Sequence, residues 1–182
     1  MRIIVFFIFA ILMSTLTFSA DKKLVCVKEK SQLTYYMVHP THSFEGINKI
    51  VVCNANYNEE TQQFLQVGVA ANVANFDSEN SNRDSHAMEV LEVLKFPRVT
   101  FLSSSIKEEN LKLIITGILT FHGVKKEITF EAKRENSNNE IIISGTFPVK
   151  LTDYKVERPS LLMIPVEDEM KISFNIVFQN SK

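Results

Sequence analysis

The sequence predicts an all-β protein, an eight-stranded antiparallel β-barrel with a short helical insert between two strands. Apolar residues alternate with polar ones in eight successive segments, which is the period of a strand with one buried face. Short polar turns such as His122-Gly123 and Glu108-Glu109-Asn110 join most of these segments. The region between Asn75 and Pro97 departs from the alternation, so we place the insert there.

The expected strands run through nearly the whole chain after residue 23. The alternation is clear in Leu33, Tyr35 and Met37, and again near the C-terminus, where five apolar residues alternate. The strands are expected at residues 24–38, 47–57, 65–73, 99–106, 111–121, 124–132, 141–151 and 170–178. Such a series, joined by short turns, indicates an antiparallel sheet that closes on itself.

A short helix is expected at residues 84–95. Ser81 and Asn82 are suitable N-cap residues, and Pro97 marks the end because proline disfavours helix at the residue before it. Three apolar residues have helical spacing, namely Ala87, Leu91 and Leu94. Residues 153–166, with two prolines, form the longest non-alternating stretch outside this helix, and we expect a loop there at one rim of the barrel.

Residues 1–20 are predicted to be a secretory signal peptide, followed by a single domain over residues 21–182. A positive residue precedes an apolar run over residues 3–13, and small residues lead to a cleavage site near Ala20, with cleavage after Ser19 as the alternative. A membrane anchor is the competing interpretation, but the run is shorter than the ~20 residues that cross a bilayer. We therefore expect a periplasmic or secreted protein.

Composition and charge narrow the class of protein. The chain is 45% hydrophobic, but 15 of its apolar residues lie in the predicted signal peptide. The remainder has the ordinary composition of a soluble domain, about 41% apolar. The chain carries 20 Lys and Arg against 21 Asp and Glu. This balance provides no basic surface, so no nucleic-acid partner is expected.

Export would place the two cysteines, Cys26 and Cys53, in an oxidising compartment, where a pair can persist as a disulfide. The bond would close a loop of nearly thirty residues and contribute ~3 kcal/mol to stability. The alternative is a pair of separate buried thiols on neighbouring strands. Both arrangements are open at this point, because a sequence does not contain the Cβ separation.

An eight-stranded barrel has an interior that side chains just fill or that holds one small ligand. The residues expected to point inward carry no charge, so a cavity between them would exclude sugars and nucleotides and accept a long apolar chain. They are Leu33, Tyr35, Met37, Val67, Val69, Ala71, Phe101, Leu113, Ile115, Leu119, Phe121, Ile128, Phe130, Phe147, Ile172, Phe174 and Ile176. From the residues alone, a barrel filled by these side chains is the alternative.

The sequence lacks recognisable motifs for catalysis or metal binding. His39 and His42 are three residues apart, but Pro40 between them disfavours a helical pair. His86 and His122 would meet only through the fold, and no cysteine or carboxylate stands at a complementary spacing. No Gly-x-Ser-x-Gly, His-Glu-x-x-His or glycine-rich phosphate loop is present. We therefore expect no catalytic residue, no metal and no cofactor.

Three motifs occur in order along the chain. They are Asn82-Arg83-Asp84-x-His86, then Phe96-Pro97-x-Val99-Thr100-Phe101-x-Ser103, then Thr116-Gly117-x-Leu119-Thr120-x-His122-Gly123-Val124-x-Lys126. Weaker matches flank them, namely His42 with Gly46, Asp153-Tyr154, and Val166-x-Asp168-Glu169. With these motifs the chain resembles the YceI-like family of exported, lipocalin-like proteins known as polyisoprenoid-binding.

The resemblance implies an elongated lipocalin-like barrel that holds an isoprenoid or similar amphiphilic lipid of the quinone-like or prenyl-phosphate class. It implies no chemistry on that lipid. The chain departs from the family at Leu151, where a basic residue often precedes the Asp-aromatic pair. This departure argues against an anionic head group held from that position.

Arg83, Asp84 and His86 of the first motif have two interpretations. They would lie at the mouth of the cavity, where Arg83 meets a phosphate or a quinone oxygen. Alternatively, Asp84 caps the helix and accepts a hydrogen bond from Arg83, so that the pair fixes the insert against the barrel. We favour the second interpretation, because a short segment between strands needs such anchoring.

Two functional hypotheses follow from the sequence. In the first, the barrel binds a long-chain lipid as its carrier, store or sensor, and both a homodimer and transient membrane contact are compatible with that role. In the second, a filled barrel without ligand serves as a structural or interaction module. The two differ in whether the purified protein contains a lipid.

Overall fold

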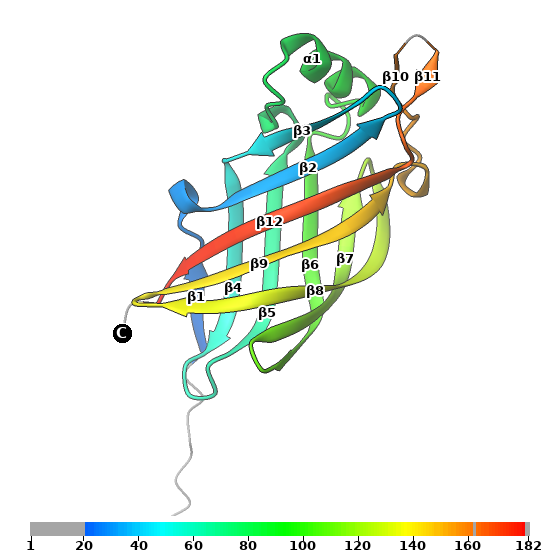
Figure 1. Ribbon diagram of the computed structural model, residues 1–182. Coiled ribbons are helices and arrows are strands. Elements are labelled where there is room, and N and C mark those ends of the chain that lie inside the picture. The colour runs from blue at the N-terminus through cyan, green and yellow to red at the C-terminus, as the bar shows by residue number, and fades with distance from the viewer. Residues whose placement is uncertain (1–20, 162, 181–182) are drawn as a thin grey trace, which may run out of the picture.

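The computed structural model describes residues 21–161 and 163–180, so the predicted signal peptide and its cleavage site lie outside the described residues. The prediction of an all-β fold with one short helix is confirmed. The number of strands is not, because the main sheet has ten antiparallel strands instead of eight. Figure 1 shows this sheet strongly curled into a half-barrel, with the helix over its upper end.

The main sheet has the strand order β1-β4-β5-β6-β7-β8-β9-β12-β2-β3. Its strands are β1 (Asp21–Val25), β2 (Gln32–His39), β3 (His42–Asn48), β4 (Val51–Asn58), β5 (Gln63–Asn72), β6 (Arg98–Glu109), β7 (Lys112–Phe121), β8 (Val124–Ser137), β9 (Glu140–Lys150) and β12 (Glu169–Gln179). A separate two-stranded sheet pairs β10 (Ser160–Leu161) with β11 (Ile164–Pro165). Single 3₁₀ turns occur at η1 (Lys28–Lys30), η2 (Val73–Asn75) and η3 (Thr152–Tyr154).

The count rises from eight to ten because the first expected strand, residues 24–38, is divided, and because β3 lies almost wholly before the expected strand at residues 47–57 and was not predicted. In the first, Leu24 and Cys26 occupy even positions but Leu33 and the apolar residues after it occupy odd ones, so one continuous strand would expose half of them. The chain breaks at η1 and crosses to the opposite margin of the sheet. β3 ends at Asn48, whose side chain accepts a hydrogen bond from the Ile50 backbone N–H at 2.8 Å, so the first two residues of the expected strand 47–57 belong to β3.

The sheet is a half-barrel because its marginal strands, β1 and β3, do not pair with each other. Each margin is linked by local contacts instead. Beyond β1, the Val27 backbone N–H donates to the Val177 carbonyl oxygen on β12 at 2.7 Å. On β3, Ile47 exchanges two backbone hydrogen bonds with Asp77, at 2.8 and 3.0 Å. The lipocalin-like closure expected from the sequence is therefore incomplete.

The helix α1 (Ser81–Val90) starts three residues earlier and ends five residues earlier than expected. Asn80 is its N-cap, with a side chain that accepts from the Arg83 backbone N–H at 3.1 Å. Glu92 has a positive φ of 45°, which ends the helical path and leads into a hydrogen-bonded turn. Leu94, predicted to lie on the apolar helical face, is consequently fully exposed.

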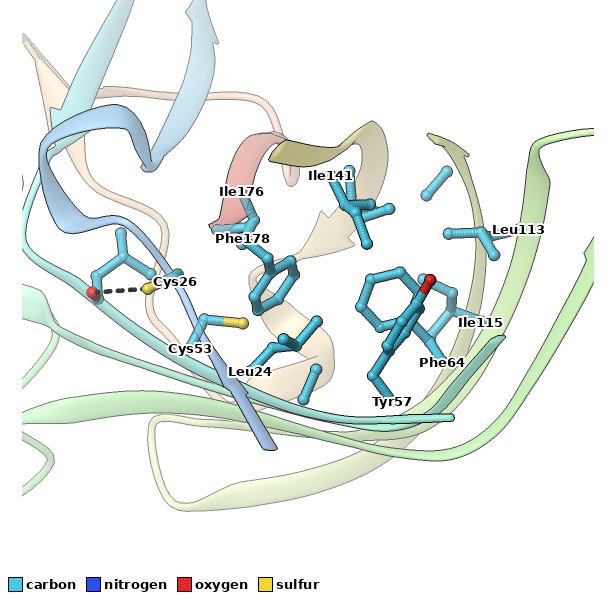
Figure 2. Close-up of a cluster of buried hydrophobic side chains, with 14 residues drawn as sticks. Leu24, Cys26, Cys53, Tyr57, Phe64, Leu113, Ile115, Ile141, Ile176 and Phe178 are labelled. Atoms are coloured by element: carbon cyan, nitrogen blue, oxygen red, sulfur yellow. Dashed lines mark hydrogen bonds between the residues drawn. The ribbon is translucent and has the colours of Figure 1, made fainter. Parts of the chain in front are cut away.

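The buried apolar residues form two clusters inside the curl. The floor cluster lies at the lower end and contains Leu24, Cys26, Val51, Cys53, Ala55, Tyr57, Phe64, Leu113, Ile115, Ala132, Ile141, Ile143, Ile176 and Phe178 (Figure 2). The upper cluster contains Met37, Leu119, Phe121, Val149, Leu151, Tyr154, Val156 and Val166. In the part of the chain that the structure describes, no helix is long and apolar enough to cross a membrane.

Candidate functional site

The interior of the curled sheet contains a cavity of about 180 Å³. Strands β5, β6, β7, β9 and β12 supply most of its wall, and α1 with the following turn covers its upper end. Nearly all of this wall is hydrocarbon. A cavity of ~150 Å³ lined by Leu, Ile and Phe stays dry and binds benzene, so this interior suits an apolar ligand better than water.

Fifteen of the seventeen residues predicted to point inward line this cavity. The two exceptions are Met37, which belongs to the upper cluster, and Ile128, which packs against that cluster. Met37 is buried opposite Phe44 on β3, with the segment that follows β9 packed in the same cluster. Alternation along a strand predicts which face is buried, but it does not predict how far along that face a cavity extends.

The wall also contains residues outside the predicted set. Phe64 and Phe178 close its lower end, while Ala87, Met88 and Leu91 enter it from α1 and the following turn. Phe178 belongs to the alternating apolar residues of the last expected strand, and Ala87 and Leu91 belong to the expected apolar face of the helix. Met88 had no such signal, because its position depends on how the helix is rotated over the sheet.

Four phenylalanines from four strands contact one another in the wall. Phe130 stacks on Phe147 with ring centroids 4.7 Å apart, and it contacts Phe101 at 5.3 Å and Phe174 at 5.6 Å. All four are only half-buried although they lie inside the curl, because they border the cavity. The interior is therefore partly hollow, and the alternative of a filled barrel does not describe it.

The lower end of the cavity is closed by aromatic packing in the floor cluster. The Phe64 ring contacts those of Tyr57 and Phe178, with centroids 5.2 and 5.5 Å apart (Figure 2). The guanidinium of Arg134 on β8 lies 5.6 Å from the Phe64 ring and 5.8 Å from the Tyr57 ring. Tyr57, Phe178 and Arg134 thus pack around the Phe64 ring at the lower end of the cavity.

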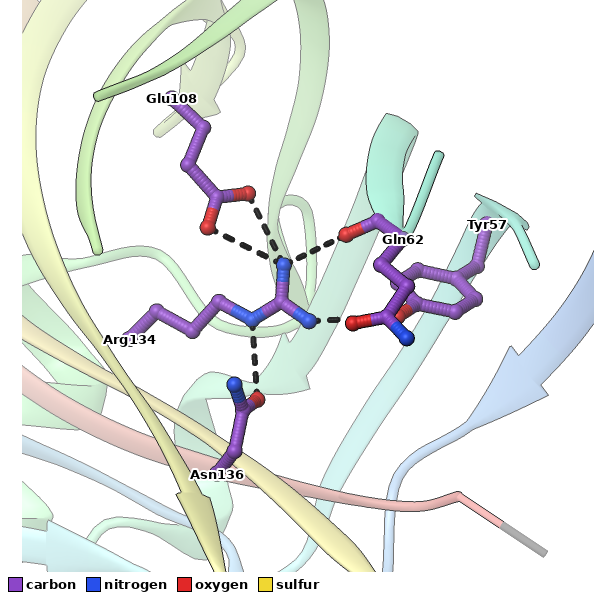
Figure 3. A network of polar contacts seen from close by, with 5 residues as sticks. All are labelled: Tyr57, Gln62, Glu108, Arg134 and Asn136. Atoms are coloured by element: carbon purple, nitrogen blue, oxygen red, sulfur yellow. Dashed lines mark hydrogen bonds and ion pairs between the residues drawn. The ribbon is translucent and has the colours of Figure 1, made fainter. Parts of the chain in front are cut away.

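Arg134 is 4% exposed, and all three of its guanidinium nitrogens have acceptors (Figure 3). Nη1 donates to Glu108 Oε2 at 2.9 Å and to the Gln62 carbonyl oxygen at 2.6 Å. Nη2 donates to the Tyr57 hydroxyl at 3.2 Å, and Nε donates to Asn136 Oδ1 at 3.0 Å. Burial of the charge is thus compensated by an ion pair and several hydrogen bonds. The network joins β6 and β8 to the turn between β4 and β5.

Four polar residues, Tyr35, Ser78, Arg83 and Asp84, lie at the end of the cavity that α1 covers; we call them the mouth group. Asp84 lines the cavity, and its oxygens accept from the Ser78 backbone N–H at 3.2 and 3.3 Å. Among the described residues, Arg83 Nε is a buried polar atom without a hydrogen-bond partner, while the equally buried Ser78 Oγ interacts with the Tyr35 hydroxyl. An unpartnered donor beside an apolar cavity is a feature that a polar ligand atom would satisfy.

Burial and the neighbouring mouth residues shift the pKa of the Tyr35 phenol. Burial raises the pKa of this phenol first, and the Asp84 carboxylate raises it further, whereas Ser78 and the Arg83 guanidinium lower it. The net pKa lies above the ordinary value of 10.0, so Tyr35 is a neutral hydrogen-bonding group at physiological pH. The mouth therefore combines two neutral hydroxyls, those of Tyr35 and Ser78, with one cation and one anion.

Arg83, Asp84 and His86 do not act as one unit. The Arg83 guanidinium lies 4.5 Å above the Phe44 ring and so fastens α1 to β3. Asp84 anchors the segment before the helix through Ser78, but it is not the N-cap, which is Asn80. His86 is exposed, with Nδ1 3.9 Å from Glu89, and is not part of the cavity wall. Arg83 and Asp84 thus both anchor the insert, but not as predicted, since Asp84 is not the cap and accepts from Ser78 instead of Arg83.

The turn that follows α1, which also covers the cavity, is held at the turn between β7 and β8. His122 Nε2 lies 3.0 Å from Glu92 Oε2, and His122 Nδ1 is 3.1 Å from the Tyr154 carbonyl oxygen. The Phe96 ring packs on His122 at 4.6 Å. His122 and Gly123 both have positive φ, as in the tight hairpin turn predicted at this dipeptide. The α1 segment is consequently fixed at both margins of the mouth.

The remaining predicted residues have structural partners. Leu151 is buried in the upper cluster, so the position that is often basic in the family holds a packed apolar side chain. Cys26, directly after β1, and Cys53 on the neighbouring β4 are free thiols, and both are buried. His39 is buried, with Nε2 3.0 Å from the Ile164 carbonyl oxygen. Within residues 21–161 and 163–180, no three His, Cys, Asp or Glu side chains gather as a metal site would require.

A curled antiparallel sheet around a partly hollow apolar interior defines a class of β-proteins whose inside is suited to a small apolar ligand. Within that class, the chain belongs to the YceI-like domain family, which it matches over residues 24–178. The resemblance inferred from the three motifs is therefore confirmed. Protein YceI of Salmonella arizonae is 42% identical to this chain over 79 residues, which are 42% of this chain and 41% of that relative. The matched region thus spans less than half the length of the relative.

Solved structures share the fold. Burkholderia cenocepacia BcnA superposes with a TM-score of 0.75 at 21% identity, covering 84% of this chain and 98% of that one. A polyisoprenoid binding domain from Saccharophagus degradans, implicated in plant cell wall breakdown, gives 0.65 at 12% identity, covering 86% and 97%. The Campylobacter jejuni YCEI protein gives 0.66 at 21% identity, covering 75% and 85%. At these identities the likeness concerns the fold alone.

Proposed function

We propose that the protein binds one long-chain isoprenoid or similar amphiphilic lipid inside the curled sheet and performs no chemistry on it. The observation that carries this proposal is the cavity, which has an apolar wall, a closed floor and polar groups at the opposite end. An amphiphilic lipid has the same division into an apolar tail and a polar head. The fold shared with a polyisoprenoid binding domain supports this ligand class.

The tail is expected to widen the cavity as it enters. At about 180 Å³, the present volume exceeds only slightly the ~150 Å³ that accommodates a benzene ring. Turning a phenylalanine such as Phe130 or Phe147 away from its preferred rotamer costs about 0.5–1.5 kcal/mol. Each buried methylene contributes ~0.8 kcal/mol, so a few methylenes outweigh the displacement of the rings. A prenyl or acyl tail buries enough methylenes to displace the rings and widen the cavity, whereas a fragment with one or two methylenes does not.

The head group is proposed to lie at the mouth, beside Tyr35, Ser78 and Arg83. Buried Arg83 Nε would donate to an oxygen of the ligand. Asp84 offsets the charge of Arg83, and the side chain of Leu151 adds none. A neutral, oxygen-bearing head of the quinone-like class therefore fits the mouth better than a prenyl phosphate, which would need a second cation.

We further propose that the mature protein acts outside the cytoplasm, after removal of the signal peptide near Ala20, as a carrier, store or sensor of this lipid. The apolar run over residues 3–13 supports export. A lipid tail enclosed by the sheet is shielded from water, which is what transport between membranes requires. Transient contact with a membrane would then occur at the end covered by α1, because the floor closes the other end.

Native mass spectrometry of the protein purified from its own host tests the binding proposal. We expect a complex whose added mass is released by organic solvent and identified by fragmentation as a single class of long-chain lipid. Protein that consistently carries no lipid, and that shows no dye-displaceable apolar site, contradicts the proposal. A phosphate-bearing lipid would support tail binding but contradict the neutral head group.

A further inference from the structure

Cys26 and Cys53 face each other on neighbouring strands. The β1–β4 register pairs Val25 with Asn54, and the next backbone N–H, that of Cys26, donates to the Cys53 carbonyl oxygen at 3.0 Å. Both side chains lie in the floor cluster, where they are 5% and 0% exposed (Figure 2). Residues opposite each other in an antiparallel pair have Cβ atoms about 4.5–5.5 Å apart, and a disulfide spans about 3.5–4.5 Å. A local shift of about 1 Å thus suffices to join them.

Cys26 follows the end of the β1–β4 ladder, and its backbone is held by the hydrogen bond to Cys53 and by a single antiparallel bridge to Phe178 on β12. Val25 is the last residue of β1, and the following Val27 already bonds to Val177 on β12. The Cys26 thiol donates only a weak hydrogen bond, to the Val51 carbonyl oxygen at 3.6 Å. Forming a disulfide would therefore sacrifice little of the existing structure.

We propose that Cys26 and Cys53 are an oxidation site, at which an organic disulfide oxidant converts the two thiols into an intramolecular cross-strand disulfide. One cysteine thiolate attacks the oxidant, forming a mixed disulfide and releasing one thiolate of the oxidant. The second cysteine thiolate attacks the mixed disulfide at the protein sulfur and releases the other. The protein loses two protons and two electrons, and the oxidant is reduced to two thiols.

The surroundings determine when this reaction takes place. Burial, and to a smaller extent Cys26, raises the pKa of the Cys53 thiol well above its usual range. A thiol of this kind is inert in the folded protein, so the bond forms while the chain folds or when the β1 margin opens, and is afterwards protected from reductants. The loop that it closes contains β2 and β3, which lie at the opposite margin of the sheet. The disulfide itself would lie at the β1–β4 margin, and the covalent loop that it closes would run through both margins of the half-barrel.

Refolding the reduced full chain with and without a mixture of reduced and oxidised glutathione tests the proposal. After refolding, the protein is unfolded, its thiols are labelled with a maleimide, and its intact mass and proteolytic peptides are measured. For the oxidised sample we expect no maleimide, a mass about 2 Da below that of the reduced chain, and a linked pair of peptides containing Cys26 and Cys53. Its melting temperature should rise by about 5–15 °C.

The double variant Cys26→Ala/Cys53→Ala is the matched control, and its melting temperature should not respond to the oxidant. Two maleimides on the wild-type chain after oxidative refolding would overturn the proposal, as would disulfides that link separate chains. If the double variant does not fold, peptide mapping of the wild-type chain still decides the question. Lipid occupancy plays no part in this measurement, so the result is independent of the proposed lipid binding.

Discussion

The ring of Tyr35 on β2 lies over Gly46, its register partner on β3. A Cβ atom at Gly46 would overlap the ring and the hydroxyl of this tyrosine. The missing side chain therefore lets the phenol lie flat against the sheet, with its hydroxyl close enough to Ser78 and Asp84 for both to influence its pKa. Gly46 determines the position of one member of the mouth group without touching the cavity itself.

From this relationship we expect Gly46→Ala to displace Tyr35 and weaken both the fold and lipid binding. Overpacking of this kind costs about 1–3 kcal/mol of unfolding free energy, which urea denaturation measures. The lipid carried by the purified protein, measured by native mass spectrometry, should fall because the displaced ring alters the mouth. Gly68→Ala is the matched control, since a Cβ there would lie at an ordinary 3.7 Å from Leu102 Cδ1. Equal losses in the two variants would contradict the role of Gly46.

Replacing Arg134 with alanine should be among the most destabilising changes on β8. The variant leaves Glu108 partly buried without its cation, and Tyr57 without its donor. Breaking a buried ion pair from one side costs about 3–5 kcal/mol, measured by urea unfolding. The neighbouring Lys133→Ala removes an exposed pair with Glu135, 2.7 Å long, and should cost less than about 1 kcal/mol. Similar losses from both changes would show that the network of Arg134 does not hold the floor.

The inward face of the sheet could be predicted from the sequence where alternation is strict. Val67, Val69 and Ala71 lie on the cavity side of β5 because a strand has a period of two and the register shift in its pairing with β4 lies before them, at Leu65. The same rule fails between β1 and β2, where the apolar positions change from even at Cys26 to odd at Leu33 and the strand is divided. A change of phase is thus a signal for strand division that the sequence does contain.

Arg134 and the place of Asp84 in the cavity wall could not be predicted from alternation in the same way. Arg134 continues the inward positions of Phe130 and Ala132, but a charge on a buried face is stable only when distant residues supply acceptors. Those acceptors come from other strands and turns, and the spacing of residues along one strand contains no information about them. Asp84 likewise reaches the cavity through the orientation of the whole helix.

The stability contributed by Asp168 should depend on pH. Its side chain accepts from the Thr152 hydroxyl at 2.7 Å and from the Thr152 backbone N–H at 2.9 Å, which lowers the pKa of the carboxyl below 3.8, although desolvation opposes this. Arg158 and Lys150 lower it further. Because the folded-state pKa is depressed, the contribution is complete above about pH 3.8 and is lost as pH falls through the folded pKa.

We therefore expect Asp168→Asn to melt at a lower temperature than the wild-type protein at neutral pH, with the difference shrinking below pH 3.8. Thermal melts followed by circular dichroism from pH 7 to pH 2 measure this difference. Asp153→Asn, which removes an exposed ion pair with Lys126, is the control, and its smaller effect should vanish in high salt. A difference for Asp168→Asn that persists undiminished at pH 2 would contradict the account.

Filling the cavity should remove the lipid without unfolding the protein. Ala71 is 3% exposed and lines the cavity, so the indole of Ala71→Trp would occupy space that the proposed tail needs. Overpacking costs about 1–3 kcal/mol, and we expect cooperative melting with little or no lipid in native mass spectra. Val69→Phe should act in the same direction with a smaller effect, because it adds less volume.

Ala70→Trp is the control, because it places the same indole on the opposite face of β5 and should leave the lipid load unchanged. An unaltered load in Ala71→Trp would show that the tail lies elsewhere, whereas its loss in both tryptophan variants would point to general destabilisation.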